Sequence, residues 1–308
     1  MVVEFIVGII SAGIMLCIPY MIAGLGEMFG QKSGVFNLGV EGIMMVGAFF
    51  AFFTELKTGS SFLGFIMAMI AGGLMGAIYA YLAVTLRVVQ GIAGIGLHLF
   101  GWGLASTFFR IYLGAITTID GVQALNVPFL SKLPILGDLF FKHNIMVYIG
   151  FALVPISWYA LNKTAWGLKV RAVGTKPRAA DTVGINVNAI RYQCVILGGI
   201  MAGLGGAYIT LCQTQIFTDN ITAGRGFIAV ALVYFGKWKP KGVMFGALLF
   251  SLAHALQRSL QVYGIDFPYE LAVMIPYVLV IVVLAFSSKS KHVKPADLGI
   301  PYNRESRL

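Results

Sequence analysis

The first candidates for chemistry are two polar side chains, Asn37 and Glu41, in an otherwise apolar, glycine-rich stretch. They are four residues apart, so in a helix they share one face. Residues 24–47 include seven glycines, each of which weakens a helix by about 1 kcal/mol relative to alanine. We therefore expect a broken helix here. Glu41 is either a functional carboxylate or a structural group that caps broken-helix amides or pairs with Lys32; for Glu27 we favour a structural role.

A second set of polar and aromatic side chains repeats every four residues. Gln90, Gly94, His98 and Trp102 would form a slowly drifting stripe on one helix face. Glutamine and histidine supply hydrogen bonds, and tryptophan supplies a flat stacking surface. This combination suits a hydroxylated or heteroaromatic solute crossing a wet pathway, whereas the alternative for His98 is a hydrogen bond between helices. Phe227, at the start of a short apolar run, is assigned to the same pathway.

The most informative stretch is polar and basic, residues 173–187 (VGTKPRAADTVGINV), inside a hydrophobic protein. Thr175 is placed to cap a short helix, Pro177 suits its first turn, and Gly184 can end it. About eight residues at ~1.5 Å rise give a rod of roughly 12 Å, too short to span a membrane. We expect a surface helix that is presented to a partner. The alternative is an ordinary solvated loop.

Signatures of the common enzyme classes are missing from the sequence. It contains no phosphate-binding P-loop, no H-E-x-x-H, no G-x-S-x-G and no Cys/His cluster with metal spacing. His98, His143, His254 and His292 are far apart along the chain. We therefore expect no catalytic residue, no metal site and no cofactor bound by this chain. An intramembrane enzyme, with residues converging from different helices, is the remote alternative.

The composition identifies a membrane protein. Of 308 residues, 58% are hydrophobic and 11% are charged, and the mean hydropathy is +0.86. A soluble domain of this size cannot hide so much apolar surface, so the bilayer must be the solvent for most of it. Apolar runs of spanning length cover residues 3–25, 63–86, 91–110, 144–161, 191–212, 242–262 and 269–287. Two shorter runs, 40–54 and 225–235, indicate broken or re-entrant spans. We predict an all-α polytopic protein with about nine transmembrane or broken helices.

Lysine and arginine positions predict the orientation. If the loop at 162–190 is cytoplasmic, sixteen of the 22 lysines and arginines fall inside and six fall outside. The N-terminus is then outside, the basic tail at 288–308 is inside, and the largest outside loop is 111–143. The net charge of +10 indicates cytoplasmic loops near anionic membrane lipid rather than nucleic-acid binding. We expect one membrane domain over residues 1–308.

Two glycine-rich motifs resemble each other, Gly72 to Gly76 (GGLMG) and Gly198 to Gly203 (GGIMAG). Glycines four apart lie on one helix face and let helix backbones approach closely, which favours packing as their cause. The alternative is a duplicated unit, as in many transporters.

Four stretches together point to a family: 27–42 (EMFGQKSGVFNLGVEG), 86–99, 174–187 and 222–246 (TAGRGFIAVALVYFGKWKPKGVMFG). On these, the chain resembles the inner-membrane permease subunits of ABC importers for nucleosides and simple sugars, relatives of the ribose and branched-chain amino acid permeases. The resemblance covers nearly the whole chain, and the first and third stretches are the specific ones.

The resemblance implies a bacterial plasma-membrane subunit that works with several partners. A second homologous permease or a copy of the chain would pair with it, two cytoplasmic ATPase subunits would use ATP and Mg²⁺ below, and an extracytoplasmic substrate-binding lipoprotein would deliver the solute above. The family's coupling helix, which docks on the ATPase, corresponds to Lys176, Pro177, Arg178, Ala179, Ala180 and Asp181 with Gly184. The family usually has Asn-Pro at Lys176-Pro177 and often Asn at His98; the first departure leaves Thr175 as the capping side chain.

The resulting prediction is the permease subunit of an ATP-driven nucleoside importer. Within the same class, a simple-sugar importer is the alternative solute assignment. A different class is a stand-alone proton-coupled carrier with Glu41 as the proton carrier, which would need no ATPase.

Overall fold

The computed structural model describes residues 2–125, 137–262 and 294–303, together with positions 268, 270, 271, 274–276, 278, 281 and 282. Helices long and apolar enough to cross a membrane are Phe5–Lys32, Ser61–Thr85, Gln90–Tyr112, Ile145–Lys163, Val187–Thr214 and Pro240–Leu260. These confirm six of the seven predicted spans, and the seventh, 269–287, lies largely outside the described residues. The chain is an all-α, multi-pass membrane protein.

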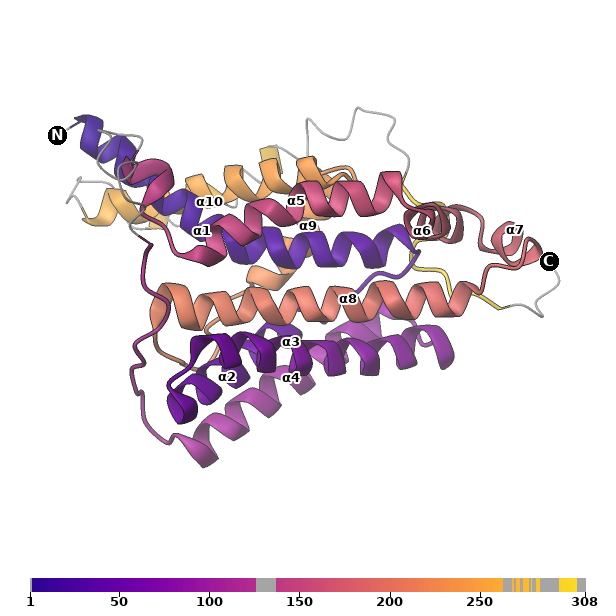
Figure 1. Cartoon of the computed structure of the whole chain (residues 1–308), viewed down its shortest axis with the longest axis horizontal. Coiled ribbons are helices and arrows are strands. Elements are labelled where there is room, and N and C mark those ends of the chain that lie inside the picture. The colour runs from indigo at the N-terminus through magenta and orange to yellow at the C-terminus, as the bar shows by residue number, and fades with distance from the viewer. Residues whose placement is uncertain are drawn as a thin grey trace.

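Figure 1 shows the helices as a bundle of long, roughly aligned rods. The first half contains α1 (Val2–Lys32), α2 (Val40–Thr58), α3 (Ser61–Ala80), which continues into the π-helical turn η1 (Tyr81–Thr85), and α4 (Gln90–Tyr112). The second half contains η3 (Gly137–Phe141), α5 (Ile145–Lys163), α6 (Ala165–Thr175), α7 (Pro177–Thr182), α8 (Val187–Tyr208), which continues into η4 (Ile209–Thr214), α9 (Arg225–Phe235) and α10 (Pro240–Val262). The part of the predicted outside loop at 126–136 lies outside the described residues.

The two short apolar runs behave differently. The run predicted at 40–54 continues as α2 to Thr58, where Gly59 adopts a left-handed conformation (φ 68°) and its amide donates to the Glu55 carbonyl. The run at 225–235 matches α9, whose 11 residues rise roughly 16 Å, about half of a hydrocarbon core. The chain therefore contains a half-helix whose N-terminal end needs polar partners within the bundle.

Helix α8 occupies the centre of the bundle, between the group α1, α5 and α10 and the group α2, α3 and α4 (Figure 1). It meets α3 through glycines: a Cβ on Gly72 would collide with the Gly199 carbonyl, and a Cβ on Gly203 would collide with the Ala68 carbonyl. The two similar glycine motifs therefore face each other across one helix contact. Close packing accounts for both of them.

The break expected after α1 is residues 33–39, where Gly34 adopts φ 95°. Part of the predicted tail packs against this break. The Asp297 amide donates to the Gly174 carbonyl (3.2 Å), the Gly299 amide donates to the Gly34 carbonyl (3.1 Å), and Leu298 is buried. Residues 294–303 are thus attached to the bundle beside α6, and the flanking parts of the tail lie outside the described residues.

Candidate functional site

Glu41 closes the N-terminal end of the half-helix α9. Its Oε1 accepts hydrogen bonds from the Thr222 hydroxyl (2.6 Å) and the Gly224 amide (2.7 Å), and its Oε2 accepts one from the Gly226 amide (2.5 Å). Glu41 is 2% exposed and lies in the first turn of α2, so the N-terminal ends of two helices meet at one carboxylate. Such ends carry unsatisfied N–H groups and partial positive charge, which a carboxylate stabilises.

These contacts match the capping alternative for Glu41. The pairing with Lys32 that was considered from the sequence is not present among the described residues. A Cβ on Gly226 would lie 2.5 Å from the Glu41 Cα, so only glycine lets α9 begin this close to α2.

Asn37 and Gln90 hold the break between α1 and α2. The Asn37 Oδ1 accepts a hydrogen bond from the Gly39 backbone N–H (2.7 Å), and the Asn37 backbone N–H donates to Glu27 Oε1 (3.0 Å). The Gln90 Oε1 accepts from the Phe36 amide (2.8 Å). All three polar side chains are buried, and each satisfies backbone groups that a broken helix leaves without partners. The contacts of Glu27 agree with the structural role expected for it.

His98, Trp102 and Phe227 lie instead on a partly exposed face formed by α4 and α9. The His98 and Phe227 rings meet edge to face, with centroids 5.1 Å apart and an interplanar angle of 72°. Trp102 is 41% exposed and Phe227 38%. A Cβ on Gly42 would lie 2.6 Å from the His98 Cα, so α2 crosses α4 closely at this point. The six predicted pathway residues thus separate into three buried ones and three on this face.

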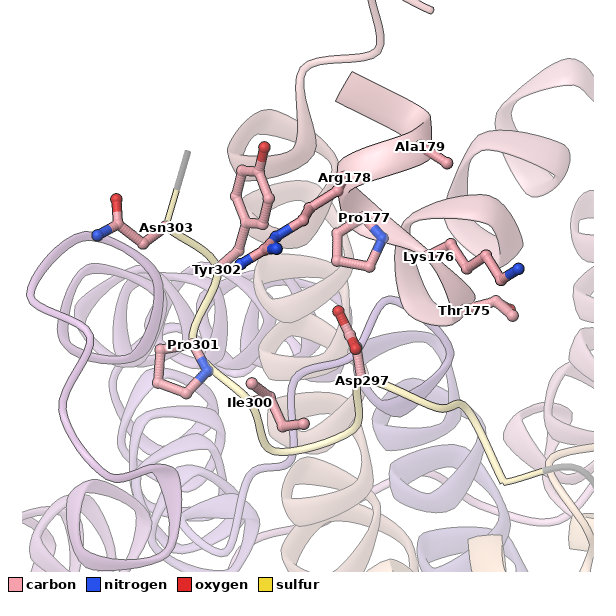
Figure 2. A pocket seen from close by; sticks show the side chains of 10 residues that line it. All are labelled: Thr175, Lys176, Pro177, Arg178, Ala179, Asp297, Ile300, Pro301, Tyr302 and Asn303. Carbon is pink, nitrogen blue, oxygen red and sulfur yellow. The ribbon is translucent and has the colours of Figure 1, made fainter. Parts of the chain in front are cut away.

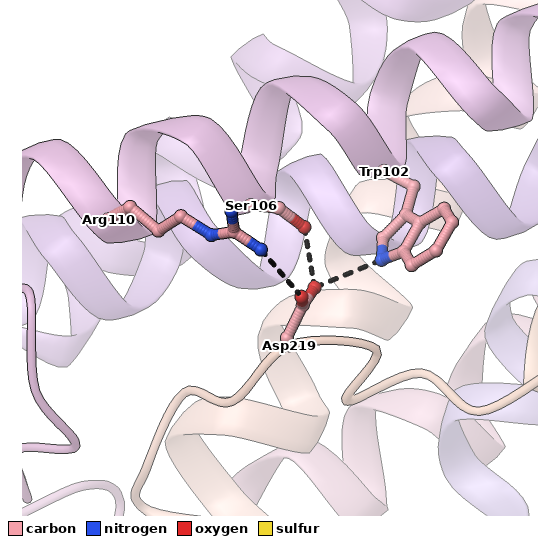
Figure 3. Close-up of polar contacts among 4 residues, drawn as sticks. All are labelled: Trp102, Ser106, Arg110 and Asp219. Carbon is pink, nitrogen blue, oxygen red and sulfur yellow. Dashed lines mark hydrogen bonds and ion pairs between the residues drawn. The ribbon is translucent and has the colours of Figure 1, made fainter.

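The structure adds a residue that was not predicted, Asp219, in the loop before α9. Its Oδ1 accepts hydrogen bonds from the Trp102 Nε1 (3.0 Å) and the Ser106 hydroxyl (2.5 Å), and its Oδ2 lies 3.9 Å from the Arg110 Nη2 (Figure 3). Ser106 and Arg110 continue the four-residue spacing of the stripe toward the end of α4. That continuation along α4 is visible in the sequence, but it does not point to Asp219, because the loop has no periodicity of its own.

Helix α7 is shorter than predicted and begins differently. It has six residues, its N-cap is Lys176, and no side chain caps it. Thr175 is the last residue of α6, and its hydroxyl donates to the Arg171 carbonyl (2.8 Å). The predicted Thr175 cap is therefore wrong, because α6 continues up to the residue before Lys176. Gly184 follows α7 at φ 84°, and its amide donates to the Asp181 carbonyl (2.9 Å), as its predicted role requires.

The predicted coupling residues do not all face outward. Pro177 and Ala180 are buried and Asp181 is half-buried, whereas the others are exposed: Lys176, Arg178, Ala179 and Gly184. Val183, just after α7, is 74% exposed and was not singled out from the sequence. The outward surface of this segment therefore consists of two cations, one aliphatic side chain, Thr182 and the small residues Ala179 and Gly184.

A cavity of about 510 Å³ separates α7 from the C-terminal segment (Figure 2). It is lined by Thr175, Lys176, Pro177, Arg178, Ala179, Asp297, Ile300, Pro301, Tyr302 and Asn303. Arg191, buried at the start of α8, fixes the segment: its Nε donates to the Ser33 carbonyl (3.2 Å) and its Nη1 donates to the Ile300 carbonyl (3.1 Å). The surface beside α7 thus contains residues 297–303 as well as the segment predicted to couple.

Cations gather at the same end of the bundle as α7. Lys32, Arg171, Lys239 and Lys241 line one pocket there, and Arg87 lines another together with Asp181 and Gly184. Helix α4 runs from this end toward the opposite one, where Arg110 meets Asp219 (Figure 1). Among the described residues, no group of three or more His, Cys, Asp or Glu side chains could hold a metal ion.

A multi-pass helical bundle with a half-helix, a partly exposed face on α4 and α9 and a short surface helix is the arrangement expected of a transport protein of the permease type. The family model for the permease component of branched-chain amino acid transport systems matches residues 9–284, and the chain belongs to this family.

The curated relatives include permeases named for nucleosides and for a sugar. The chain is 34% identical to the guanosine ABC transporter permease protein NupQ of Bacillus subtilis, over 99% of both chains. It is 34% identical to the nucleoside ABC transporter permease protein NupC of Lactococcus lactis, over 92% of this chain and 93% of the relative. It is 38% identical to a putative glucose ABC transporter permease protein of Haloferax volcanii, over 82% of this chain and 78% of the relative. No solved structure matches the chain.

Proposed function

We propose that this chain is the transmembrane permease subunit of an ATP-driven nucleoside importer. The observation that carries the proposal is the likeness to the guanosine permease, which extends over 99% of both chains and so includes every element of the bundle. The partly exposed face of Trp102, His98 and Phe227 supports it, because stacking surfaces beside hydrogen-bonding groups suit a solute made of an aromatic base and a hydroxylated sugar.

The proposal assigns the chain to a complex in a bacterial plasma membrane. Separate ATPase subunits dock on the exposed residues of 176–184 and hydrolyse ATP with Mg²⁺, a second homologous permease or a second copy completes the pathway, and a substrate-binding lipoprotein docks on the opposite end. The cations beside α7 support a cytoplasmic position for that end, with the N-terminus outside. The chain itself catalyses no reaction and binds no cofactor; its α7 segment transmits closure of the ATPase pair to the bundle.

Import of a simple sugar is the second candidate, and the 38% identity to a putative glucose permease favours it. A stand-alone proton-coupled carrier is less well supported. Its proposed proton carrier, Glu41, is surrounded by three hydrogen-bond donors of the α9 end, which hold the carboxylate in place as a cap.

The proposal is tested by purifying the chain from its native membranes after light crosslinking and identifying the co-purifying proteins by mass spectrometry. We expect an ATPase with a P-loop, a second permease and a lipoprotein. The recovered complex is then reconstituted in vesicles, and uptake of radiolabelled guanosine and of glucose is measured with and without ATP. ATP-dependent guanosine uptake supports the proposal; glucose uptake alone favours the sugar importer. Uptake driven by a proton gradient without any ATPase would overturn both.

A further inference from the structure

The outer part of the α4 stripe places an exposed indole beside an exposed carboxylate. Trp102 is 41% exposed, and the Asp219 side chain, which accepts its Nε1–H, is 44% exposed. Charged groups with this exposure are costly against lipid hydrocarbon, so this face turns toward water or toward a polar pathway. An exposed aromatic plane next to a carboxylate is a surface that can bind a solute.

The carboxylate is fixed in position yet keeps acceptor capacity. The hydrogen bonds from Trp102 and Ser106 both reach Oδ1, whereas Oδ2 faces Arg110 at 3.9 Å (Figure 3). An ionised carboxylate offers about four lone-pair positions, so Oδ2 can accept further donors. Hydroxyl groups are such donors, and Oδ2 has lone pairs for both of two neighbouring hydroxyls on one sugar.

The surface continues one helical turn further along α4. His98 precedes Trp102 by four residues, about 6 Å along a helix axis. Its ring meets Phe227, and its Nδ1 has no hydrogen-bond partner among the described residues. The His98 Nδ1 is itself buried, so the face offers aromatic area on one side of Trp102 and a carboxylate on the other.

We infer that Trp102 and Asp219 form a nucleoside-recognition site, in which the base stacks on the indole of Trp102 and the vicinal ribose hydroxyls donate to Asp219. The inference rests on the proposed function and adds to it a residue that reads the sugar. A site built to bind hydroxyl groups rejects analogues that lack them, because its polar groups are then left unpaired. Asp219 is thus a specificity residue for the ribose diol.

The test compares guanosine with 2′,3′-dideoxyguanosine in vesicles that contain the complete transporter. The variant Asp219→Asn keeps an oxygen for Trp102 and Ser106 but removes the charge. We expect it to lower kcat/KM for guanosine about tenfold or more, and to leave that for the dideoxy analogue nearly unchanged. The binding protein and the ATPases are the same in both preparations, so their own selectivity cancels in this comparison.

The controls separate recognition from a merely structural role. Asp120→Asn changes an exposed carboxyl at the same end of the molecule and should leave both solutes unaffected. Trp102→Leu should lower uptake of both solutes, and Trp102→Phe should retain more of it because a ring remains. Equal losses for guanosine and its dideoxy analogue in Asp219→Asn, or no loss for either, would overturn the inference while leaving the proposed function intact. Failure of the unaltered transporter to import any nucleoside would overturn the proposed function, and this inference with it.

Discussion

At the scale of single residues, Glu41 shows how a carboxylate in the first turn of one helix, α2, can cap the N-terminal end of another, α9. In Glu41→Gln, an NH₂ group replaces one carboxylate oxygen. This hydrogen-bond donor then faces other donors, either the Gly226 backbone N–H or the Thr222 hydroxyl and the Gly224 backbone N–H. Because a buried donor is then left unsatisfied, we expect a loss of about 1–3 kcal/mol of stability. The measurement is the thermal unfolding midpoint of the purified chain in detergent, with Asp120→Asn as the control. An unchanged midpoint together with lost transport would instead identify Glu41 as a pathway carboxylate.

The residue scale also shows the limits of spacing. A period of four placed His98 and Trp102 on one helix face, because side chains at i and i+4 are neighbours in any helix. Spacing could not identify Asp219, since a loop residue reaches the stripe only through the fold. Spacing also could not separate Gln90 from Trp102. The Gln90 side chain is buried and accepts a hydrogen bond from the Phe36 backbone N–H, whereas Trp102 is exposed. That difference depends on which elements cover α4.

At the scale of elements, the contact between α3 and α8 depends on the absence of side chains. In Gly203→Ala the new methyl group would collide with the Ala68 carbonyl on α3, so the two helices must separate. Overpacking of this kind costs about 1–3 kcal/mol, and backbone atoms cannot move aside as a side chain can. We expect a lower unfolding midpoint and reduced yield in membranes. Gly8→Ala is the matched control, because no atom lies within 4 Å of its Cβ position. Equal behaviour of the two variants would contradict the packing assignment.

The short helix α7 gives a second prediction at this scale, because two adjacent alanines differ in burial. Ala179 is exposed and Ala180 is buried. Ala179→Glu should leave the chain folded but weaken ATPase docking, so that ATP hydrolysis no longer drives uptake. Ala180→Glu would bury a charge without a partner and should lower the unfolding midpoint. The measurements are uptake, ATPase activity and thermal unfolding of the assembled complex. Normal coupled transport by Ala179→Glu would exclude this face as the docking surface.

The sequence predicted the long elements well because a spanning helix needs about 20 apolar residues and little else. It predicted the start of α7 wrongly, because Thr175 is a good cap in isolation but belongs here to α6. It also gave no sign that residues 294–303 are attached. That attachment uses backbone groups of Gly34 and Gly174 and the buried Arg191, and backbone hydrogen bonds between distant segments leave no pattern in side-chain types.

At the scale of the whole molecule, the end that carries α7 is rich in cations and contains hydrogen bonds between distant segments of the chain. The Arg191 guanidinium connects the C-terminal segment to the break after α1, and the same break is bound by Gln90 at the start of α4. The Trp238 Nε1, in the turn after α9, donates to the Gln31 Oε1 of α1 (2.8 Å). Hydrogen bonds therefore connect the end that carries α7 to α1, to the start of α4 and to the turn after α9, and α4 and α9 form the partly exposed face.

The orientation of this asymmetric molecule is open to a direct measurement. Cys17 and Cys194 are buried, so replacing the half-buried Cys212 with alanine leaves a suitable background for single cysteines. Val183→Cys marks the end with α7, and Ile116→Cys marks the opposite end; both positions are exposed. With sixteen of 22 cationic side chains assigned inside, a membrane-impermeant maleimide should label Ile116→Cys in intact cells and Val183→Cys only after permeabilisation. The reverse pattern would place α7 outside, where no cytoplasmic ATPase can dock on it, and would remove the basis for coupling through this helix.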